Sequence, residues 1–124
     1  MADHHLTRCE LEVMQVVWDQ GCVTVQDVVD VLGRALAYTT VLTTMKILDD
    51  KRIVRRAGKQ GRAYLYQPLI TREDVRRSMT SELKDALFGG SLKSMVLSLI
   101  DDSGLQRKDV DELRRAIKSL EADS

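Results

Sequence analysis

The sequence has few cysteines, few aromatic residues and no long apolar run. Its two cysteines, Cys9 and Cys22, lie in segments that look structured, and nothing else indicates an oxidising compartment, so we expect reduced thiols. No stretch reaches the roughly 18 apolar residues that span a bilayer, and the N-terminus has no apolar signal core. These absences predict a cytoplasmic protein that does not bind membranes directly.

The sequence also lacks the motifs that carry catalysis. It contains no HExxH, no CxxC, no glycine-rich phosphate loop and no GxSxG. His4 and His5 stand near the N-terminus, and no histidine or carboxylate is placed to complete a metal site with the two cysteines. We therefore predict no enzyme activity, no catalytic or metal site, and no cofactor.

The composition is that of a folded chain with a thin core. Hydrophobic residues make up 44% of the 124 residues and charged residues 31%, whereas aromatic residues make up only 4%. The core is therefore built mostly from valine, leucine, isoleucine and methionine. Because small units bury a smaller fraction of their surface, such a chain favours further burial by self-association.

The formal net charge is zero, but the basic residues are concentrated. Between Arg34 and Arg62 lie eight basic and two acidic residues, so the rest of the chain has an acidic excess. A local basic excess can hold a polyanion in a neutral molecule. On charge alone, an ordinary solvated face explains the cluster equally well.

The first two helices are predicted from their caps and apolar periodicity. A helix from Thr7 to about residue 19 begins with Thr7 as N-cap, and Glu10 follows three residues later. We expect it to bury a stripe of Leu11, Met14, Val17 and Trp18. The valine-rich segment 24–33 has a strand-like composition, but its apolar spacing of i, i+3, i+4 and i+7 favours a helix.

A third helix and a hairpin follow. The helix covers about residues 39–51 and turns Val41, Thr44, Met45 and Leu48 inward. Residues 53–57 and 62–67 are predicted strands, joined by a turn at 58–61 and closed by Pro68. The order of three helices and a two-stranded hairpin over residues 6–68 is the plan of a winged helix-turn-helix.

Helical patterns continue to the C-terminus. A fourth helix covers 71–87, a fifth follows the Ser91 N-cap, and a last one runs over about 106–121 with a coiled-coil-like 3, 4, 3 apolar spacing. The predicted fold class is mainly α with a small β-hairpin. A winged helix-turn-helix domain occupies residues 1–70, and a three-helix region occupies residues 71–124.

In this plan the third helix enters a DNA major groove, so its outward residues are candidates for reading bases. Four threonines of this helix lower its helix propensity without an evident structural benefit. The alternative is that its outward residues form an ordinary solvated helix face. The candidate base-reading residues are Tyr38, Thr39, Thr40, Thr43 and Lys46.

The hairpin is the wing of this plan, and its basic residues would lie along the phosphate backbone. The alternative is a charged edge that blocks strand pairing. The candidate backbone-contacting residues are Arg55, Arg56, Lys59, Arg62 and Tyr64.

Several segments together resemble the penicillinase-repressor family, the BlaI/MecI-type transcriptional repressors. They are Leu6-Thr7, Glu10 to Met14 and Trp18, the run Ala37 to Thr44, Gly61 to Tyr64, Tyr66 to Pro68, and Phe88 to Ser91. The resemblance implies a homodimeric repressor that binds a palindromic operator in double-stranded DNA, with the helices after Pro68 forming the dimer interface. The candidate dimer residues are Met79, Leu83, Leu87, Leu92, Met95, Val96, Leu99, Ile100, Val110, Leu113, Ile117 and Leu120.

The resemblance also implies a way of release. Penicillinase-type members are inactivated when a membrane-bound zinc protease sensor cuts the C-terminal domain, at a bond that falls at Ser98–Leu99 here, where the better-known family pair is Asn-Phe. Two alternative functions stay open: a winged-helix protein-interaction module, and a thiol- or metal-responsive regulator that uses Cys9 and Cys22.

Overall fold

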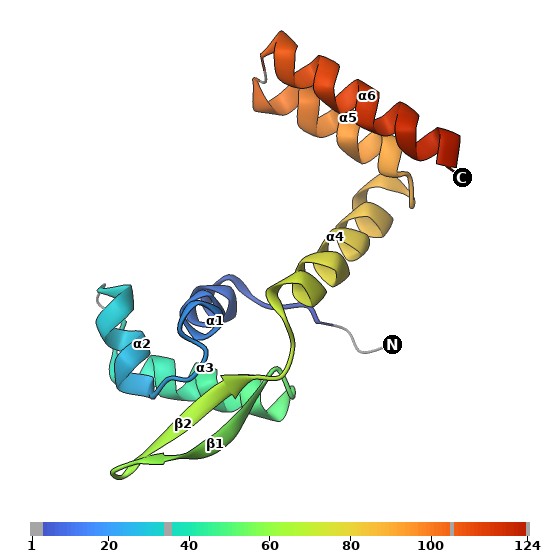
Figure 1. Ribbon diagram of the computed structural model, residues 1–124. Helices are drawn as coiled ribbons and strands as arrows, with labels where there is room; N and C mark the ends of the chain where they lie inside the picture. The colour runs from blue at the N-terminus through green and yellow to red at the C-terminus, as the bar shows by residue number, and fades with distance from the viewer. Residues whose placement is uncertain (1–3, 34–35, 105, 124) are drawn as a thin grey trace. The chain divides into compact units, whose positions relative to one another are not determined.

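The computed structural model of the protein describes residues 4–33, 36–104 and 106–123. The chain divides into two compact units, Met1–Thr80 and Ser81–Ser124. The described residues form six helices and one two-stranded antiparallel hairpin, which confirms the predicted fold class (Figure 1). The elements are α1 (Arg8–Gln20), α2 (Val25–Leu32), α3 (Tyr38–Asp50), β1 (Val54–Gln60), β2 (Ala63–Pro68), α4 (Arg72–Phe88), α5 (Leu92–Ser103) and α6 (Arg107–Asp123).

Capping boxes start the first two helices. The Thr7 hydroxyl accepts from the Glu10 backbone N–H, and the Glu10 carboxylate accepts from the Thr7 N–H. Thr24 and Asp27 make the same exchange at the start of α2. Each pair satisfies two backbone groups that a helix end otherwise leaves without partners, so both predicted helix starts are confirmed.

The core of unit 1 is aliphatic, as the low aromatic content predicted. On α1 the buried stripe is broader than expected: Val13 and Val16 are buried, whereas Leu11 and Trp18 are only partly buried against the core. The expected stripe was too narrow because α1 packs against α2, α3 and β2 at once. The fully buried large side chains are Leu6, Met14, Met45, Leu48, Ile53, Val13, Val17, Val23, Val28, Val41 and Val54.

The hairpin is longer than predicted and is joined to the segment between α1 and α2. Val23 and Tyr66 exchange two backbone hydrogen bonds of 3.0 and 2.7 Å, so a single antiparallel β-bridge joins this segment to β2. The predicted turn at 58–61 was wrong in extent, because β1 continues through Gln60 and only Gly61 and Arg62 connect the strands. Gly61, with φ of 66°, stands at the first turn position, where a type II′ turn requires glycine.

The end of α3 contains a strained residue. The Arg52 and Ile53 N–H groups donate to the carbonyls of Asp49 and Leu48, which is the Schellman pattern of helix termination. This pattern needs a left-handed backbone after the C-cap, and Arg52 adopts it with φ of 62°. The position usually belongs to glycine, because a Cβ there costs about 1 to 2 kcal/mol.

We expect Arg52→Gly to raise the free energy of unfolding by about 1 kcal/mol. Urea denaturation followed by circular dichroism measures the change. Arg52→Ala is the matched control, since it removes the same charge but keeps the Cβ, and it should give no comparable gain. An equal gain in the free energy of unfolding in both variants would show that the arginine charge, and not the left-handed backbone, is the cause.

The first turns of α4 are anchored to α1 within unit 1. Val75 is buried in the core, and the Trp18 indole N–H donates to the Ile70 carbonyl at 2.9 Å. The Arg72 guanidinium lies over the Trp18 ring and contacts the Asp19 carboxylate at 2.6 Å. The start of α4 therefore has a fixed place on the N-terminal unit.

Unit 2 contains the remainder of α4, together with α5 and α6. The Ser91 hydroxyl caps α5 by accepting from the Ser94 N–H, and Gly104 ends this helix in the left-handed conformation. Met95 is buried, but large leucine side chains of this unit lie in solvent: Leu83, Leu87, Leu92, Leu97 and Leu99. Among the described residues, no helix has the length and apolar character needed to cross a membrane.

Candidate DNA interface

The two sides of α3 separate as its periodicity predicted. Val41, Thr44, Met45 and Leu48 are buried. The buried Thr44 hydroxyl donates to the Thr40 carbonyl at 2.8 Å, so its burial leaves no unpaired donor. The side chains on the outer side are all exposed: Tyr38, Thr39, Thr40, Thr43 and Lys46.

Ile47 is an exposed residue of α3 that sequence reasoning missed. It lies four residues after Thr43, and 42% of its surface is exposed. An apolar side chain on this face can contact a thymine methyl group. The signal was present in the sequence, since Ile47 lies outside the inward set at 100° per residue.

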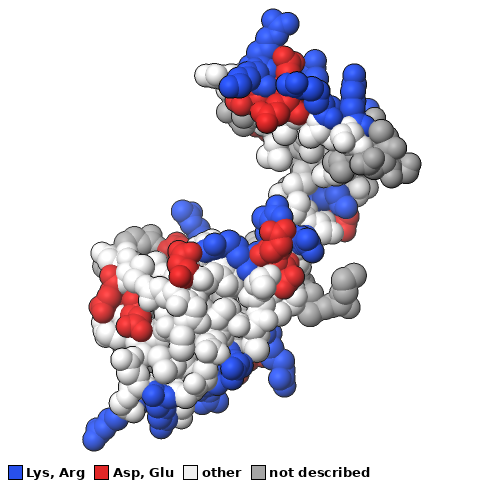
Figure 2. Space-filling model, in the orientation of Figure 1, with Lys and Arg blue, Asp and Glu red and all other residues white. Residues whose placement is uncertain are grey.

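The hairpin lies directly beside α3. The Arg56 Nε is 3.4 Å from the Asp49 carboxylate of α3, which ties β1 to the last turn of this helix. Figure 2 shows Lys and Arg side chains gathered along the lower edge of unit 1 over the hairpin, and acidic side chains over α2. The helix α3, which carries the exposed candidate residues, and the basic hairpin are therefore neighbours in unit 1. Arg34, which was counted in the basic segment, lies outside the described residues.

The basic residues of the hairpin have different partners. The Arg55 guanidinium donates to the Gln67 side-chain oxygen at 2.8 Å across the hairpin. Arg56 and Lys59 lie over the ring of Tyr64, at 5.0 and 4.9 Å from its centroid. Arg62 is exposed in the turn. The sequence placed these residues in one group, whereas the structure gives them three separate environments.

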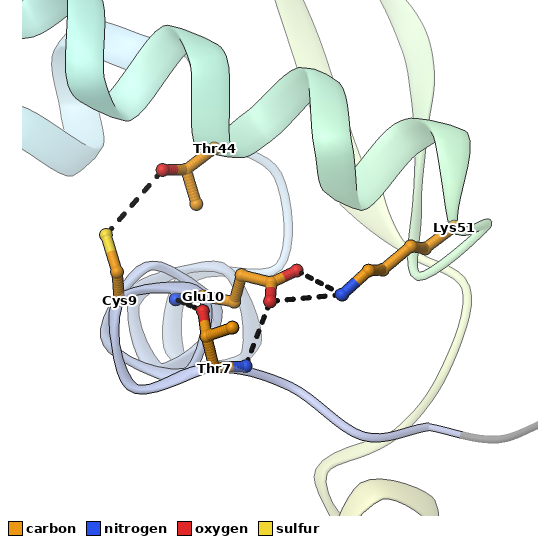
Figure 3. A network of polar contacts seen from close by, with 5 residues as sticks. All are labelled: Thr7, Cys9, Glu10, Thr44 and Lys51. Atoms are coloured by element: carbon orange, nitrogen blue, oxygen red, sulfur yellow. Dashed lines mark hydrogen bonds and ion pairs between the residues drawn. The ribbon is translucent and has the colours of Figure 1, made fainter.

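A polar network holds the C-terminal end of α3 against α1 (Figure 3). The carboxylate of Glu10, which is only 3% exposed, accepts from the Lys51 ammonium at 2.8 and 3.1 Å. Burial raises the pKa of Glu10, but the hydrogen bonds from Lys51 and Thr7 outweigh that effect, so its pKa lies below the ordinary value. The sequence identified Glu10 only as a capping residue, because nothing local links it to a lysine 41 positions away.

Both cysteines are free. Cys9 is partly buried, and its sulfur lies 3.6 Å from the Thr44 hydroxyl, whereas Cys22 is exposed (Figure 3). Among the described residues, no three His, Cys, Asp or Glu side chains are grouped so that they could hold a metal ion.

The candidate dimer residues fall in several environments. Met79 belongs to unit 1 and packs partly buried against its core. In unit 2, Met95 is buried, and the Leu120 side chain lies outside what the structure describes. The exposed ones are Leu83, Leu87, Leu92 and Leu99, and the half-buried ones are Val96, Ile100, Val110, Leu113 and Ile117.

The chain is similar along its length to known transcriptional repressors. Transcriptional regulator BlaI of Mycobacterium tuberculosis is 33% identical over 117 residues, which cover 91% of this chain and 83% of that protein. The penicillinase repressor of Staphylococcus aureus is 25% identical over 117 residues, covering 93% of this chain and 92% of that protein.

Solved structures agree with the winged-helix assignment. The solution structure of the DNA-binding domain of the repressor BlaI matches with a TM-score of 0.52 at 27% identity, covering 58% of this chain and 89% of that domain. A mutant MarR from E. coli matches 93% of this chain and 77% of that chain with a TM-score of 0.53 at 16% identity, which is a likeness of fold alone. The model of the family described as penicillinase repressor matches residues 6–119. With a match over nearly all of its residues, this chain belongs to the penicillinase repressor family.

Proposed function

We propose that the protein is a transcriptional repressor that binds a palindromic operator as a homodimer. The observation that carries this proposal is the exposed polar side of α3 beside a basic hairpin, in a chain of a repressor family. An α-helix fits a major groove about 12 Å wide, and a flanking hairpin can then reach the phosphates.

The two elements would have different roles in binding. Threonine hydroxyls and the Lys46 ammonium on α3 can donate to base edges, and threonine methyl groups can contact thymine. Basic side chains of the hairpin would neutralise phosphates, which adds affinity and fixes the orientation without selecting a sequence. Specificity would therefore come from α3, and most of the salt dependence from the hairpin.

Homodimerisation is proposed for unit 2. Its five exposed leucines present apolar side chains that a second copy could cover, and burial in a dimer would remove them from water. A two-fold dimer places two copies of α3 on half-sites about one helical turn of DNA apart, which makes the operator palindromic.

Release by proteolysis at Ser98–Leu99 is part of the proposal and rests on the family resemblance. This bond lies in the middle of α5, with Ser98 half-buried and Leu99 exposed. A cut there would remove residues 99–124, including all of α6, and with them six of the twelve candidate dimer residues.

We expect Lys46→Ala and Arg62→Ala to weaken operator binding in different ways. Loss of a base contact at Lys46 should reduce the affinity for the operator by about 1 to 3 kcal/mol. Loss of a phosphate contact at Arg62 should lower the slope of log K against log salt by about one. Gel shifts and fluorescence anisotropy over a salt series, with the DNA upstream of the gene, measure both quantities.

The matched control is Arg77→Ala, an exposed arginine of α4 outside α3 and the hairpin, which should bind like wild type. If the wild-type protein gives no shift even at low salt, the proposal is wrong, and a winged-helix protein-interaction module becomes the better account. If both test variants bind like wild type, the roles given to α3 and the hairpin are wrong.

A further inference from the structure

Strand β1 contains one extra residue relative to β2 in the middle of the hairpin. Arg56 pairs with Tyr66 and Lys59 pairs with Tyr64, so three steps along β1 match two steps along β2. The irregularity is a β-bulge between Arg56 and Lys59, where Gly58 has φ of 119°. Glycine adopts this backbone conformation without the steric penalty that a Cβ would bring.

The bulge changes which face of the hairpin Lys59 occupies. Successive side chains of a regular strand point to opposite faces, so residues three apart, such as Arg56 and Lys59, would lie on opposite sides. Paired residues share a face, and Tyr64 and Tyr66 are two apart on β2. The extra residue therefore brings Arg56 and Lys59 to the same face.

Tyr64 holds these two cations together. The Arg56 Cζ lies 5.0 Å and the Lys59 Nζ 4.9 Å from the centroid of its ring, within the range of a cation–π contact. Arg56 also contacts the Asp49 carboxylate. A chain of contacts thus runs from α3 through Arg56 and Tyr64 to Lys59. It contains two cations and one carboxylate, so its net charge is positive.

Arg55 lies on the other face. It pairs with Gln67 in the register, and its guanidinium donates to the Gln67 side chain. Of the two faces, the one that bears Arg56 is connected to α3 through Asp49. The Arg56 face is therefore the better placed of the two to meet a duplex that α3 also contacts.

We propose that Arg56 and Lys59, held side by side on the Tyr64 ring, form the phosphate-binding face of the wing, and that Arg55 does not contact the duplex. This inference rests on the proposed DNA-binding function and divides the basic hairpin into a binding and a non-binding face. The ligand is the phosphodiester backbone of double-stranded DNA. Tyr64 is a positioning residue in this arrangement.

Salt titrations of single variants test the division of faces. The probe is a labelled duplex from the DNA upstream of the gene, measured by fluorescence anisotropy with wild-type protein and with each alanine variant. Arg56→Ala and Lys59→Ala should each lower the salt slope by about one, and Arg55→Ala should leave it unchanged. Equal losses in all three variants, or a loss in Arg55→Ala alone, would overturn the proposal.

A charge-conserving variant tests the role of the bulge. The double variant Lys59→Gln/Gln60→Lys moves the same charge by one residue, to a position that pairs with Ala63 on the opposite face. It should lose as much salt slope as Lys59→Gln. Binding equal to wild type would show that the face occupied by the lysine does not matter, and would overturn the proposal.

Tyr64 variants test positioning. Tyr64→Phe keeps the ring and should bind like wild type, whereas Tyr64→Leu should weaken binding roughly three- to tenfold. Equal binding by both variants would refute the positioning role. Lys46→Ala in the same assay separates the failure of this inference from the failure of the DNA-binding proposal. If Lys46→Ala weakens binding while all variants of the wing behave as wild type, the inference fails and the DNA-binding proposal stands. If wild-type protein does not bind the duplex, both fail.

Discussion

Replacing Lys51 by methionine lowers the free energy of unfolding by about 2 kcal/mol, because it leaves the Glu10 carboxylate buried without its cation. Removing one partner of a fully buried pair costs about 3 to 5 kcal/mol. The Lys51 side chain is 41% exposed, so water can replace part of the lost contact and the expected value lies below that range. Urea denaturation at neutral pH measures the change.

The effect depends on pH in a defined direction. The pKa of Glu10 in the folded protein lies below its ordinary value of 4.5, so the unfolded chain binds more protons in the acid range. The stability supplied by this carboxylate is present above pH 4.5 and is lost as the pH falls through its folded-state pKa. The difference between wild type and Lys51→Met should therefore shrink on acidification below about pH 4.

Two further variants isolate the ion pair. Lys51→Arg keeps a cation and should recover most of the stability. In the double variant Glu10→Gln/Lys51→Met a neutral amide replaces the carboxylate, so the loss should be smaller than in Lys51→Met alone. Losses that simply add, or a Lys51→Met effect that is the same at pH 7 and at about pH 3, would contradict an interaction between these two residues.

Replacing Leu87 by glutamate should separate the proposed dimer without unfolding the chain. In a single copy this side chain is 69% exposed, so the substitution should change the stability of the subunit by no more than about 0.5 kcal/mol. At a dimer interface the same change buries an unpaired charge, which is strongly unfavourable. Sedimentation velocity over a concentration series measures the association.

Loss of the dimer should reduce operator affinity much more than any single DNA contact does. Two linked copies of α3 on two half-sites bind with an avidity that can exceed single-site affinity by about 10² to 10⁴. We expect Leu87→Glu to lose roughly a hundredfold or more in affinity for the full operator. Its affinity for a single half-site should be close to that of wild type.

Leu69→Glu is the matched control, because Leu69 is also an exposed leucine, at 47%, but lies in unit 1. It should remain dimeric. A chain ending at Ser98 should behave like Leu87→Glu, since it lacks α6 and part of α5. A Leu87→Glu protein that still sediments as a dimer at micromolar concentration would place the interface elsewhere.

Local sequence signals predicted most of the fold. Thr7 and Ser91 were identified as N-caps from short-range patterns, and each caps its helix as expected. The inward residues of α3 followed from periodicity, because one helix face must enter the core. The hairpin was less accurate, since the bulge at Gly58 and the two-residue turn depend on pairing between strands.

Contacts between distant residues could not be predicted. The Glu10–Lys51 and Asp49–Arg56 pairs join different elements and leave no trace in local spacing. The same limit applies to the faces of the wing, because an inserted residue reverses the alternation that a regular strand would have. Sequence reasoning could therefore identify which hairpin residues are basic, but not which of them share a surface.

The two hydrogen bonds between Val23 and Tyr66 make the root of the hairpin part of the same framework as the helices. A ribbon held in this way cannot swing as a rigid flap about its base. Any adjustment to the contour of a bound partner then falls to the turn residues Gly61 and Arg62, beyond the last paired residues of the strands. The direction of the hairpin is thus set by its hydrogen bonds to the segment before α2, and the details of its contact with a partner are set at the turn.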